Sequence, residues 1–293
     1  MAEQTKQIQW FPGHMAKTRR LIAENLKLVD IVIEVLDARI PYSSRNPEIP
    51  RLIGDKPTLI LLNKATLADR ETTAAWQYSY TKNGAVAIPL DCLSGEGIHA
   101  VEAEIKKILS AKLERYENKG MAGRALKAMI VGIPNVGKSS LINRICGTKK
   151  VKVEDRPGVT LNKQWVPTKI GLDLMDMPGV LWPKFDDPRI GEALAMTGAI
   201  RDAILDTEHI AMLLCGRLRN ICPELFCARY KIDPKILPDF DDYELFELVG
   251  RKRGFLVSGG EVDTERTSKI LLDEFRGGKI GPISLEAPPR GDA

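Results

Sequence analysis

An eight-residue segment, Gly132-Ile-Pro-Asn-Val-Gly-Lys-Ser139, matches the complete phosphate-loop pattern G-x-x-x-x-G-K-S. The apolar run that leads into it (128–132) predicts a strand, and the run that follows it (138–146) predicts a helix. Such a loop binds phosphate because backbone N–H groups at the start of the helix turn inward around the anion. The segment therefore predicts an α/β domain, with a mainly parallel sheet and helices on both faces.

The order of the motifs is reversed relative to an ordinary GTPase. Asn63-Lys64 ends the apolar run 57–62 and resembles the guanine-reading motif of such enzymes. That motif normally follows the phosphate loop, whereas here it precedes it. We interpret residues 1–182 as a circularly permuted P-loop GTPase domain. We expect the nucleotide site to have the usual three-dimensional arrangement, although its motifs follow one another in a different order along the chain.

The composition is that of an ordinary soluble protein, with 44% hydrophobic and 28% charged residues. No apolar run approaches the roughly 18 residues that a membrane span requires. The first residues have no apolar signal segment either, so we expect no membrane association. Five cysteines without a C-x-x-C pair indicate reduced thiols and a cytoplasmic protein.

Strands alternate with helices through the first domain, after an N-terminal cap segment that begins with an aromatic turn at 10–14. Buried strands are expected at 29–36, 57–62, 85–90 and 128–132, with an antiparallel pair at 164–169 and 172–176. Helices are expected at 15–28, 97–115 and 138–146.

After residue 182 the strand-like runs end and apolar stripes at helical spacing replace them. Helices are expected at 190–200, 208–218, 243–249 and 267–275. Residues 183–293 therefore predict a C-terminal all-helical domain with a disordered tail at 286–293. Residues 1–182 carry 27 Lys and Arg against 19 Asp and Glu. This excess favours a polyanionic partner, although a basic solvated surface explains it equally well.

Within the phosphate loop, Lys138 is expected to place its ammonium on the β- and γ-phosphates, and the Ser139 hydroxyl to hold Mg²⁺. Asn135 either offers its side-chain oxygen to a monovalent cation such as K⁺ or braces the loop. The neighbouring residues of the loop are also expected to bind GTP through their backbone: Val136, Gly137 and Ser140.

A second phosphate-facing segment is Asp176-Met-Pro-Gly179, which follows a predicted strand. Asp176 is expected to reach Mg²⁺ through water, and the Gly179 N–H to contact the γ-phosphate. Thr160, in a polar loop between the two motifs, is expected to complete the Mg²⁺ shell. The next residue, Val180, stands where many GTPases have a glutamine that orients the attacking water. Another group must therefore position that water.

The base-reading segment is Asn63-Lys64-Ala65-Thr66, where Asn63 is expected to tie loops together and Lys64 to stack on the base. GTPases normally have an aspartate at the position of Thr66. We therefore expect weakened guanine selectivity, and a gain of roughly 1–3 kcal/mol for GTP in Thr66→Asp. Asp91-Cys92 ends the next strand and is expected to offer a backbone N–H to guanine O6.

Together with the segment Trp10-Phe-Pro-Gly-His-Met-Ala-Lys17, these motifs resemble the ribosome biogenesis GTPase A family over nearly the whole chain. The resemblance implies a factor that hydrolyses GTP late in assembly of the large ribosomal subunit and binds ribosomal RNA. It also implies slow hydrolysis that the subunit stimulates, dependence on Mg²⁺ with help from K⁺, and a catalytic role for His14. The helical domain 183–293 is then an RNA-binding domain.

Two other functions are compatible with the sequence. One is a nucleotide-gated binding module that hydrolyses GTP slowly or not at all. The other is a permuted GTPase that acts in another ribosomal assembly step. His14 could also brace the aromatic turn rather than act in catalysis. We expect a monomer with GTP or GDP bound.

Overall fold

The computed structural model describes residues 12–121, 123–147, 164–168, 171–179, 181–182 and 185–289. The chain forms two compact units. The first comprises Met1–Asp186 and Glu286–Ala293, and the second comprises Asp187–Leu285. In the chain, the second unit is thus inserted between two segments of the first. It begins a few residues later than the boundary predicted at 182/183.

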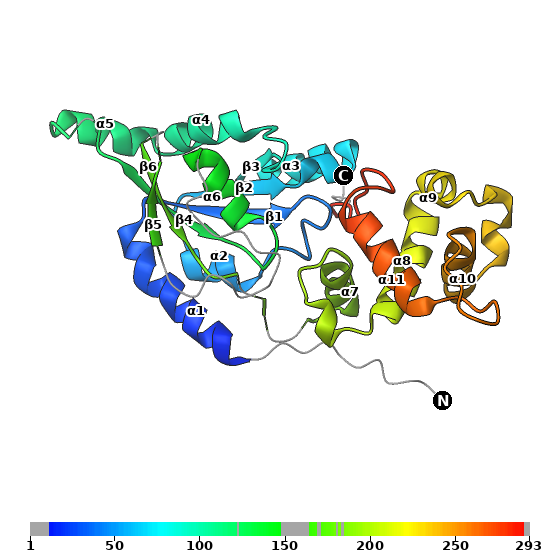
Figure 1. The fold of residues 1–293 in the computed structure, drawn as a ribbon. Helices are drawn as coiled ribbons and strands as arrows, with labels where there is room; N and C mark the ends of the chain where they lie inside the picture. Colours follow the sequence, from blue (N-terminus) through cyan, green and yellow to red (C-terminus); the bar gives the residue numbers. More distant parts are fainter. Residues whose placement is uncertain are drawn as a thin grey trace. The chain divides into compact units, whose positions relative to one another are not determined.

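Six strands of the first unit form one sheet in the order β3-β2-β1-β4-β6-β5 (Figure 1). They are β1 (Ile31–Asp37), β2 (Thr58–Asn63), β3 (Val86–Pro89), β4 (Leu126–Val131), β5 (Gln164–Pro167) and β6 (Leu172–Asp176). Every pair is parallel except β5 with β6. All seven residues of β1 are buried, as expected for a strand with neighbours on both sides and helices on both faces. The predicted α/β architecture is confirmed, with strand ends within two residues of expectation.

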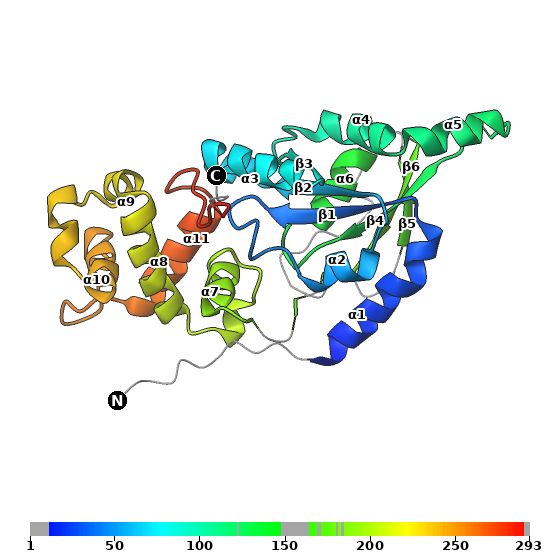
Figure 2. The same cartoon turned by 180° about the vertical axis from the view of Figure 1, so that it is seen from behind.

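Helices cover both faces of this sheet, as Figures 1 and 2 show. On one face lie α1 (Pro12–Asn25), continued by a 3-10 turn η1 (Leu26–Leu28), and α2 (Glu48–Ile53). On the other lie α3 (Arg70–Lys82), α4 (Ile98–Ile108), α5 (Ser110–Asn118) and α6 (Lys138–Cys146). A core cluster underlies each layer. The α1/α2 cluster includes Ile22, Val32, Ile49, Met129 and Met175, and the α3 cluster includes Leu36, Ile60, Leu62, Trp76 and Tyr80.

Two local predictions for this unit were wrong, and the helices α2 and α3 were missed. The helix expected at 97–115 is interrupted at Leu109, whose backbone (φ −101°, ψ 15°) leaves the helical region, so α4 and α5 are separate. The turn expected at 10–14 is in part helical, because α1 begins at Pro12, and proline suits the first turn of a helix. Helix α3 was missed because it buries only Thr73, Trp76 and Tyr80.

The second unit is helical throughout its described residues. It contains α7 (Pro188–Met196), η3 (Asp202–Ile204), α8 (Thr207–Ile221), α9 (Pro223–Tyr230), η4 (Pro234–Asp239), α10 (Asp242–Lys252) and α11 (Thr264–Arg276). Aspartates cap the N-termini of α7, α8, α10 and α11 by accepting a backbone N–H: Asp187, Asp206, Asp241 and Asp263. Helix α8 packs against α10 and α11. The predicted helical domain is thereby confirmed, and α9 was missed.

The segment 286–289 does not behave as the disordered tail that we expected. The Glu286 carboxylate accepts the backbone N–H groups of Tyr42 (2.9 Å) and Ser43 (3.1 Å). The Trp76 indole N–H donates to the Glu286 carbonyl oxygen at 3.0 Å. These bonds hold Glu286 against β1–α2 loop residues and α3 of the first unit.

Among the described residues, the helices are all too short or too polar to cross a membrane.

Candidate nucleotide-binding site

The predicted phosphate-loop residues, and those that follow β2, β3 and β6, lie at one edge of the parallel sheet. Because β1, β2, β3, β4 and β6 run in the same direction, their carboxyl ends lie along one edge. From β1 the chain builds the sheet outward to β3, and then returns to place β4 on the other side of β1. This reversal creates a switch point between β1 and β4, where open α/β sheets bind ligands. The phosphate loop follows β4 directly.

Backbone geometry explains the glycines of the phosphate loop. Gly132 has φ 150°, and an added Cβ would lie 2.5 Å from the Val35 carbonyl oxygen. Gly137 has φ 97°, and an added Cβ would lie 2.2 Å from the Asn63 amide nitrogen. Asn135 is held at φ 59°, which asparagine tolerates better than most residues. The loop ends at Lys138, the first residue of α6, so the N-terminus of that helix points at the site.

The predicted phosphate-binding cation, Lys138, is buried and held by its own loop. Its ammonium donates to the carbonyl oxygens of Gly132 (3.1 Å) and Ile133 (2.7 Å). Burial lowers the pKa of Lys138 from 10.5 to about 8, and the negative charge of Asp176 opposes this shift. A phosphate group beside the ammonium would favour its charged form.

The segment after β6 contacts the phosphate loop. Asp176 ends β6, is 1% exposed and acts electrostatically on Lys138. Gly179 packs so closely that an added Cβ would lie 2.8 Å from both the Lys138 ammonium and the Pro134 backbone nitrogen. Ser139 and Ser140 are half-buried in the first turn of α6. The other two residues of this prediction, Thr160 and Val180, lie outside the described residues.

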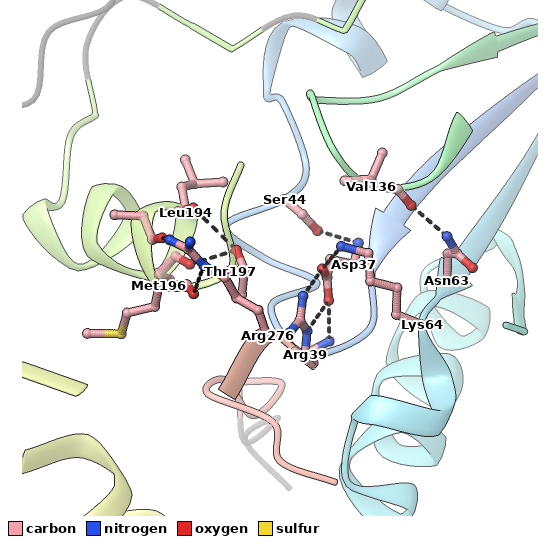
Figure 3. Close-up of polar contacts among 12 residues, drawn as sticks. Asp37, Arg39, Ser44, Asn63, Lys64, Val136, Leu194, Met196, Thr197 and Arg276 are labelled. Atoms are coloured by element: carbon pink, nitrogen blue, oxygen red, sulfur yellow. Dashed lines mark hydrogen bonds and ion pairs between the residues drawn. The ribbon is translucent and has the colours of Figure 1, made fainter. Parts of the chain in front are cut away.

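Asn63 joins the two halves of the site, although they lie far apart in the chain (Figure 3). Its side-chain amide donates to the Val136 carbonyl oxygen in the phosphate loop at 2.6 Å. Its side-chain oxygen accepts the Cys92 backbone N–H at 3.0 Å. Asn63 is 1% exposed, so both bonds are shielded from water. One residue therefore fixes the phosphate loop relative to both base-side loops.

A buried ion pair positions Lys64 (Figure 3). Lys64 adopts a left-handed conformation (φ 62°), and its ammonium lies 2.9 Å from the Asp37 carboxylate. The Arg39 guanidinium also donates to both oxygens of Asp37, at 2.9 and 2.7 Å. Burial by itself would raise the pKa of Asp37, but the charges of Arg39 and Lys64 outweigh it and hold this pKa well below its usual range.

Sequence reasoning missed Asp37 and Arg39. The sequence signal that could have identified Asp37 is that it ends an apolar run, as Asn63 does. In the structure the two residues are partners in register at the ends of β1 and β2.

The loop after β3 is closely braced. Its first four N–H groups have partners within the site region: Asp91 donates to the Glu96 carbonyl, Cys92 to Asn63, and Leu93 and Ser94 to the Asp91 carboxylate. A guanine O6 would have to share one of these groups. From α6, Arg144 donates to the carbonyl oxygens of Cys92 (3.0 Å) and Leu93. No sequence motif indicates this role of Arg144.

Thr66 and Asp91 contact each other, since the Thr66 hydroxyl donates to the Asp91 carboxylate. Ala65, between Lys64 and Thr66, donates its N–H to the Leu90 carbonyl at 3.0 Å. Asp69, three residues after Thr66, caps α3 by accepting the Thr72 N–H at 2.7 Å. The side chain of His14 lies outside the described part of the structure, which gives only its place in α1.

A family model described as a 50S ribosome-binding GTPase matches residues 127–219. The match begins in β4, just before the phosphate loop, and leaves out β2 with Asn63. This starting point is expected if the base-reading strand precedes the phosphate loop in the chain.

Full-length relatives are similar over nearly the whole chain. "Ribosome biogenesis GTPase A" of Priestia megaterium is 46% identical over 286 residues, which cover 97% of this chain and 98% of the relative. The protein of the same name from Bacillus cereus is 44% identical over 281 residues, covering 96% and 94%. The GNP-bound crystal structure of YlqF from T. maritima aligns with a TM-score of 0.63 at 28% identity, covering 93% of this chain and 99% of that one.

Proposed function

Because the chain belongs to the ribosome biogenesis GTPase A family, a family of GTPases that assist ribosome assembly, we propose that it acts on the large subunit. In this proposal the GTP-bound protein binds ribosomal RNA of a late large-subunit precursor, and hydrolysis to GDP releases it. The second unit, Asp187–Leu285, contributes RNA contacts. The protein works as a cytoplasmic monomer, and the particle accelerates its slow hydrolysis.

The observation that carries the nucleotide assignment is the pair of hydrogen bonds made by Asn63. They connect the phosphate loop to the loop after β3. A single nucleotide could therefore contact the phosphate loop with its phosphates and the loop after β3 with its base. We assign Lys138, the N-terminus of α6 and Gly179, which lie together, to the phosphate side. We assign Lys64, Thr66 and the loop at Asp91 and Cys92 to the base side.

Proteins of the GTPase family use Mg²⁺, and the donors in this site fit that ion. Mg²⁺ prefers oxygen ligands, and Ser139 and the buried Asp176 provide a hydroxyl and a carboxylate beside the phosphate loop. We assign Thr160 as a further oxygen ligand. When bound, the ion neutralises charge on the phosphates.

The decisive experiment is multiple-turnover GTP hydrolysis with and without purified large ribosomal subunits. We expect clear stimulation by large subunits but not by small subunits. We also expect co-sedimentation with large-subunit precursors in GTP and its loss in GDP. Binding without any stimulated turnover would favour a nucleotide-gated binding module instead.

We assign a K⁺ site to Asn135, whose side-chain oxygen lies in the phosphate loop at a residue with φ 59°. A cation there would spread positive charge toward the phosphates. Hydrolysis should therefore be faster in K⁺ than in Na⁺ at equal ionic strength. Asn135→Gly should remove this difference, because glycine tolerates the same backbone conformation but has no side-chain oxygen. Equal rates of the parent protein in the two salts would contradict the assignment.

We assign the positioning of the attacking water to His14, because Val180 cannot orient it. His14→Ala should retain GTP binding and subunit binding but lose most of the subunit-stimulated turnover. The matched control is Arg20→Ala, which changes an exposed residue of the same helix. Unchanged stimulated turnover in His14→Ala would show that the histidine is structural.

A further inference from the structure

The residue that departs from the usual guanine-reading pattern, Thr66, contacts a carboxylate from another strand. Thr66 lies in the 3-10 turn η2 (Ala65–Leu67) after β2, and Asp91 lies directly after β3 and Leu90. Because β2 and β3 are parallel neighbours, these two connections meet at the nucleotide edge. The bond from the Ala65 N–H to the Leu90 carbonyl (3.0 Å) holds them together.

The hydrogen bond between the two side chains has a defined direction. A carboxylate has no proton to donate, so the Thr66 hydroxyl is the donor to Asp91. Asp91 is 3% exposed, and its other oxygen accepts the N–H groups of Leu93 (2.7 Å) and Ser94 (3.0 Å). The carboxylate is thereby fixed in place, while Thr66 is exposed.

This direction determines what Thr66 offers to a ligand. Its single proton is committed to Asp91, so its oxygen can only accept a further hydrogen bond. Guanine presents donors on its Watson–Crick edge, the N1–H and the exocyclic amine. Adenine presents an unprotonated, accepting N1 at the corresponding place. The Thr66–Asp91 pair can only accept hydrogen bonds from a base, so it is complementary to the donors of guanine. With adenine, the Thr66 oxygen and adenine N1 would be two acceptors facing each other, a mismatch that polar sites reject strongly.

We propose that the Thr66–Asp91 pair reads guanine in this protein, with Thr66 contacting the base and Asp91 supplying the negative charge from the neighbouring strand. The proposal rests on the proposed function, since it concerns the base subsite of the same nucleotide site. It replaces the expectation that Thr66 weakens guanine selectivity. The carboxylate is still present, but a different connection provides it.

The Thr66–Asp91 pair also changes the expected effect of Thr66→Asp, the substitution that restores the aspartate usual in GTPases, on nucleotide affinity. Thr66→Asp would place a second carboxylate against Asp91, and like charges at such a distance repel. We therefore expect Thr66→Asp to weaken GDP binding rather than tighten it. The double variant Thr66→Asp/Asp91→Asn should recover GDP binding, because the asparagine can donate to the new carboxylate and its oxygen can still accept the loop N–H groups.

The test is a matrix of nucleotide affinities measured by calorimetry on the full chain. The ligands are GDP, IDP, which lacks the exocyclic amine, and ADP. Thr66→Val removes the hydroxyl at nearly constant shape and should weaken GDP at least about tenfold while ADP changes little. The penalty for IDP relative to GDP should shrink in the same variant. Thr66→Ser keeps the hydroxyl and should retain parent-like affinities.

The possible contrary results are distinct. Parent-like GDP affinity in Thr66→Val, or equal losses of GDP and ADP, would overturn base reading by the pair. Tighter GDP binding in Thr66→Asp alone would do the same. Failure of the nucleotide site itself has another signature. If the phosphate loop did not bind the nucleotide, Lys138→Ala would leave the GDP affinity unchanged. That result would contradict the proposed nucleotide site, whereas the Thr66 variants test only how the base is recognised.

Discussion

The ammonium of Lys138 is buried and donates to carbonyl groups of its own loop. Its pKa of about 8 lies far below the 10.5 of a free lysine, mainly because of burial. A phosphate would raise this pKa again, so nucleotide binding above pH 8 must be accompanied by proton uptake. The protonation state of one side chain thus links nucleotide affinity to pH.

We predict that GDP affinity falls about fourfold between pH 7 and pH 8.5, as expected for a group that titrates near pH 8 and must be charged to bind. Calorimetry in two buffers of different ionisation enthalpy should show net proton uptake at pH 8.5 and little at pH 7. Lys138→Arg serves as the control, since arginine stays protonated throughout and its residual affinity should not change with pH. A flat profile without proton uptake in the parent protein would refute the shifted pKa.

Helix α6 contributes more than its N-terminus. Near its other end, Arg144 donates to the Cys92 and Leu93 carbonyl oxygens in the loop after β3. The guanidinium also lies against Gly95, where an added Cβ would come within 2.9 Å of an Arg144 nitrogen. The helix that begins at the phosphate loop therefore also holds the loop after β3.

We predict that Arg144→Ala weakens GDP binding several-fold while the free energy of unfolding changes by only about 1 kcal/mol, since partly exposed hydrogen bonds contribute little to stability. Arg144→Lys should recover part of the affinity, because one ammonium cannot reproduce the fork of a guanidinium. Arg115→Ala, at an exposed position of α5, is the control. Affinity in Arg144→Ala equal to that of the control would show that the loop holds its shape without α6.

A buried carboxylate lies within the second unit and is surrounded by hydrogen-bond donors of that unit. Glu274 is 6% exposed, and its carboxylate accepts hydrogen bonds from Arg229 (3.0 and 2.7 Å), Tyr230 (3.0 Å) and Arg253. Burial alone would raise the pKa of Glu274. The bonds from Arg229, Arg253 and Tyr230 outweigh it and lower the pKa from 4.5 to about 2.

A carboxyl group whose pKa is lower in the folded state stabilises that state above its unfolded pKa. The contribution is complete above about pH 4.5 and is lost as the pH falls toward 2. Glu274→Gln should therefore destabilise the protein by up to about 3 kcal/mol at pH 7 and by less at pH 3.5. Urea unfolding followed by circular dichroism measures the difference. Glu265→Gln, at an exposed position of the same helix, should show neither effect. A pH-independent gap between parent and Glu274→Gln would exclude this linkage.

The sequence by itself determined the features that depend on contiguous residues. The phosphate loop is encoded by one strand, a glycine-rich turn and one helix, so its pattern was sufficient to predict β4 and α6. The reversed order of Asn63 and Lys138 is likewise a property of the linear chain, and it predicted the permuted sheet. Apolar runs fixed the strands within two residues because a strand buried on both faces needs uninterrupted apolar side chains.

Only the tertiary structure decided which distant residues meet. Asp37 pairs with Lys64, Thr66 with Asp91, and Arg144 with the Cys92 carbonyl, through contacts between connections of different strands. Glu286 likewise contacts Ser43 across 243 positions in the chain. No local periodicity encodes such pairs, because strand order and register set them. For the same reason the sequence suggested that the base subsite lacks a carboxylate, because Thr66 stands where GTPases have an aspartate. The fold instead brings the Asp91 carboxylate to Thr66 from the connection after the neighbouring strand.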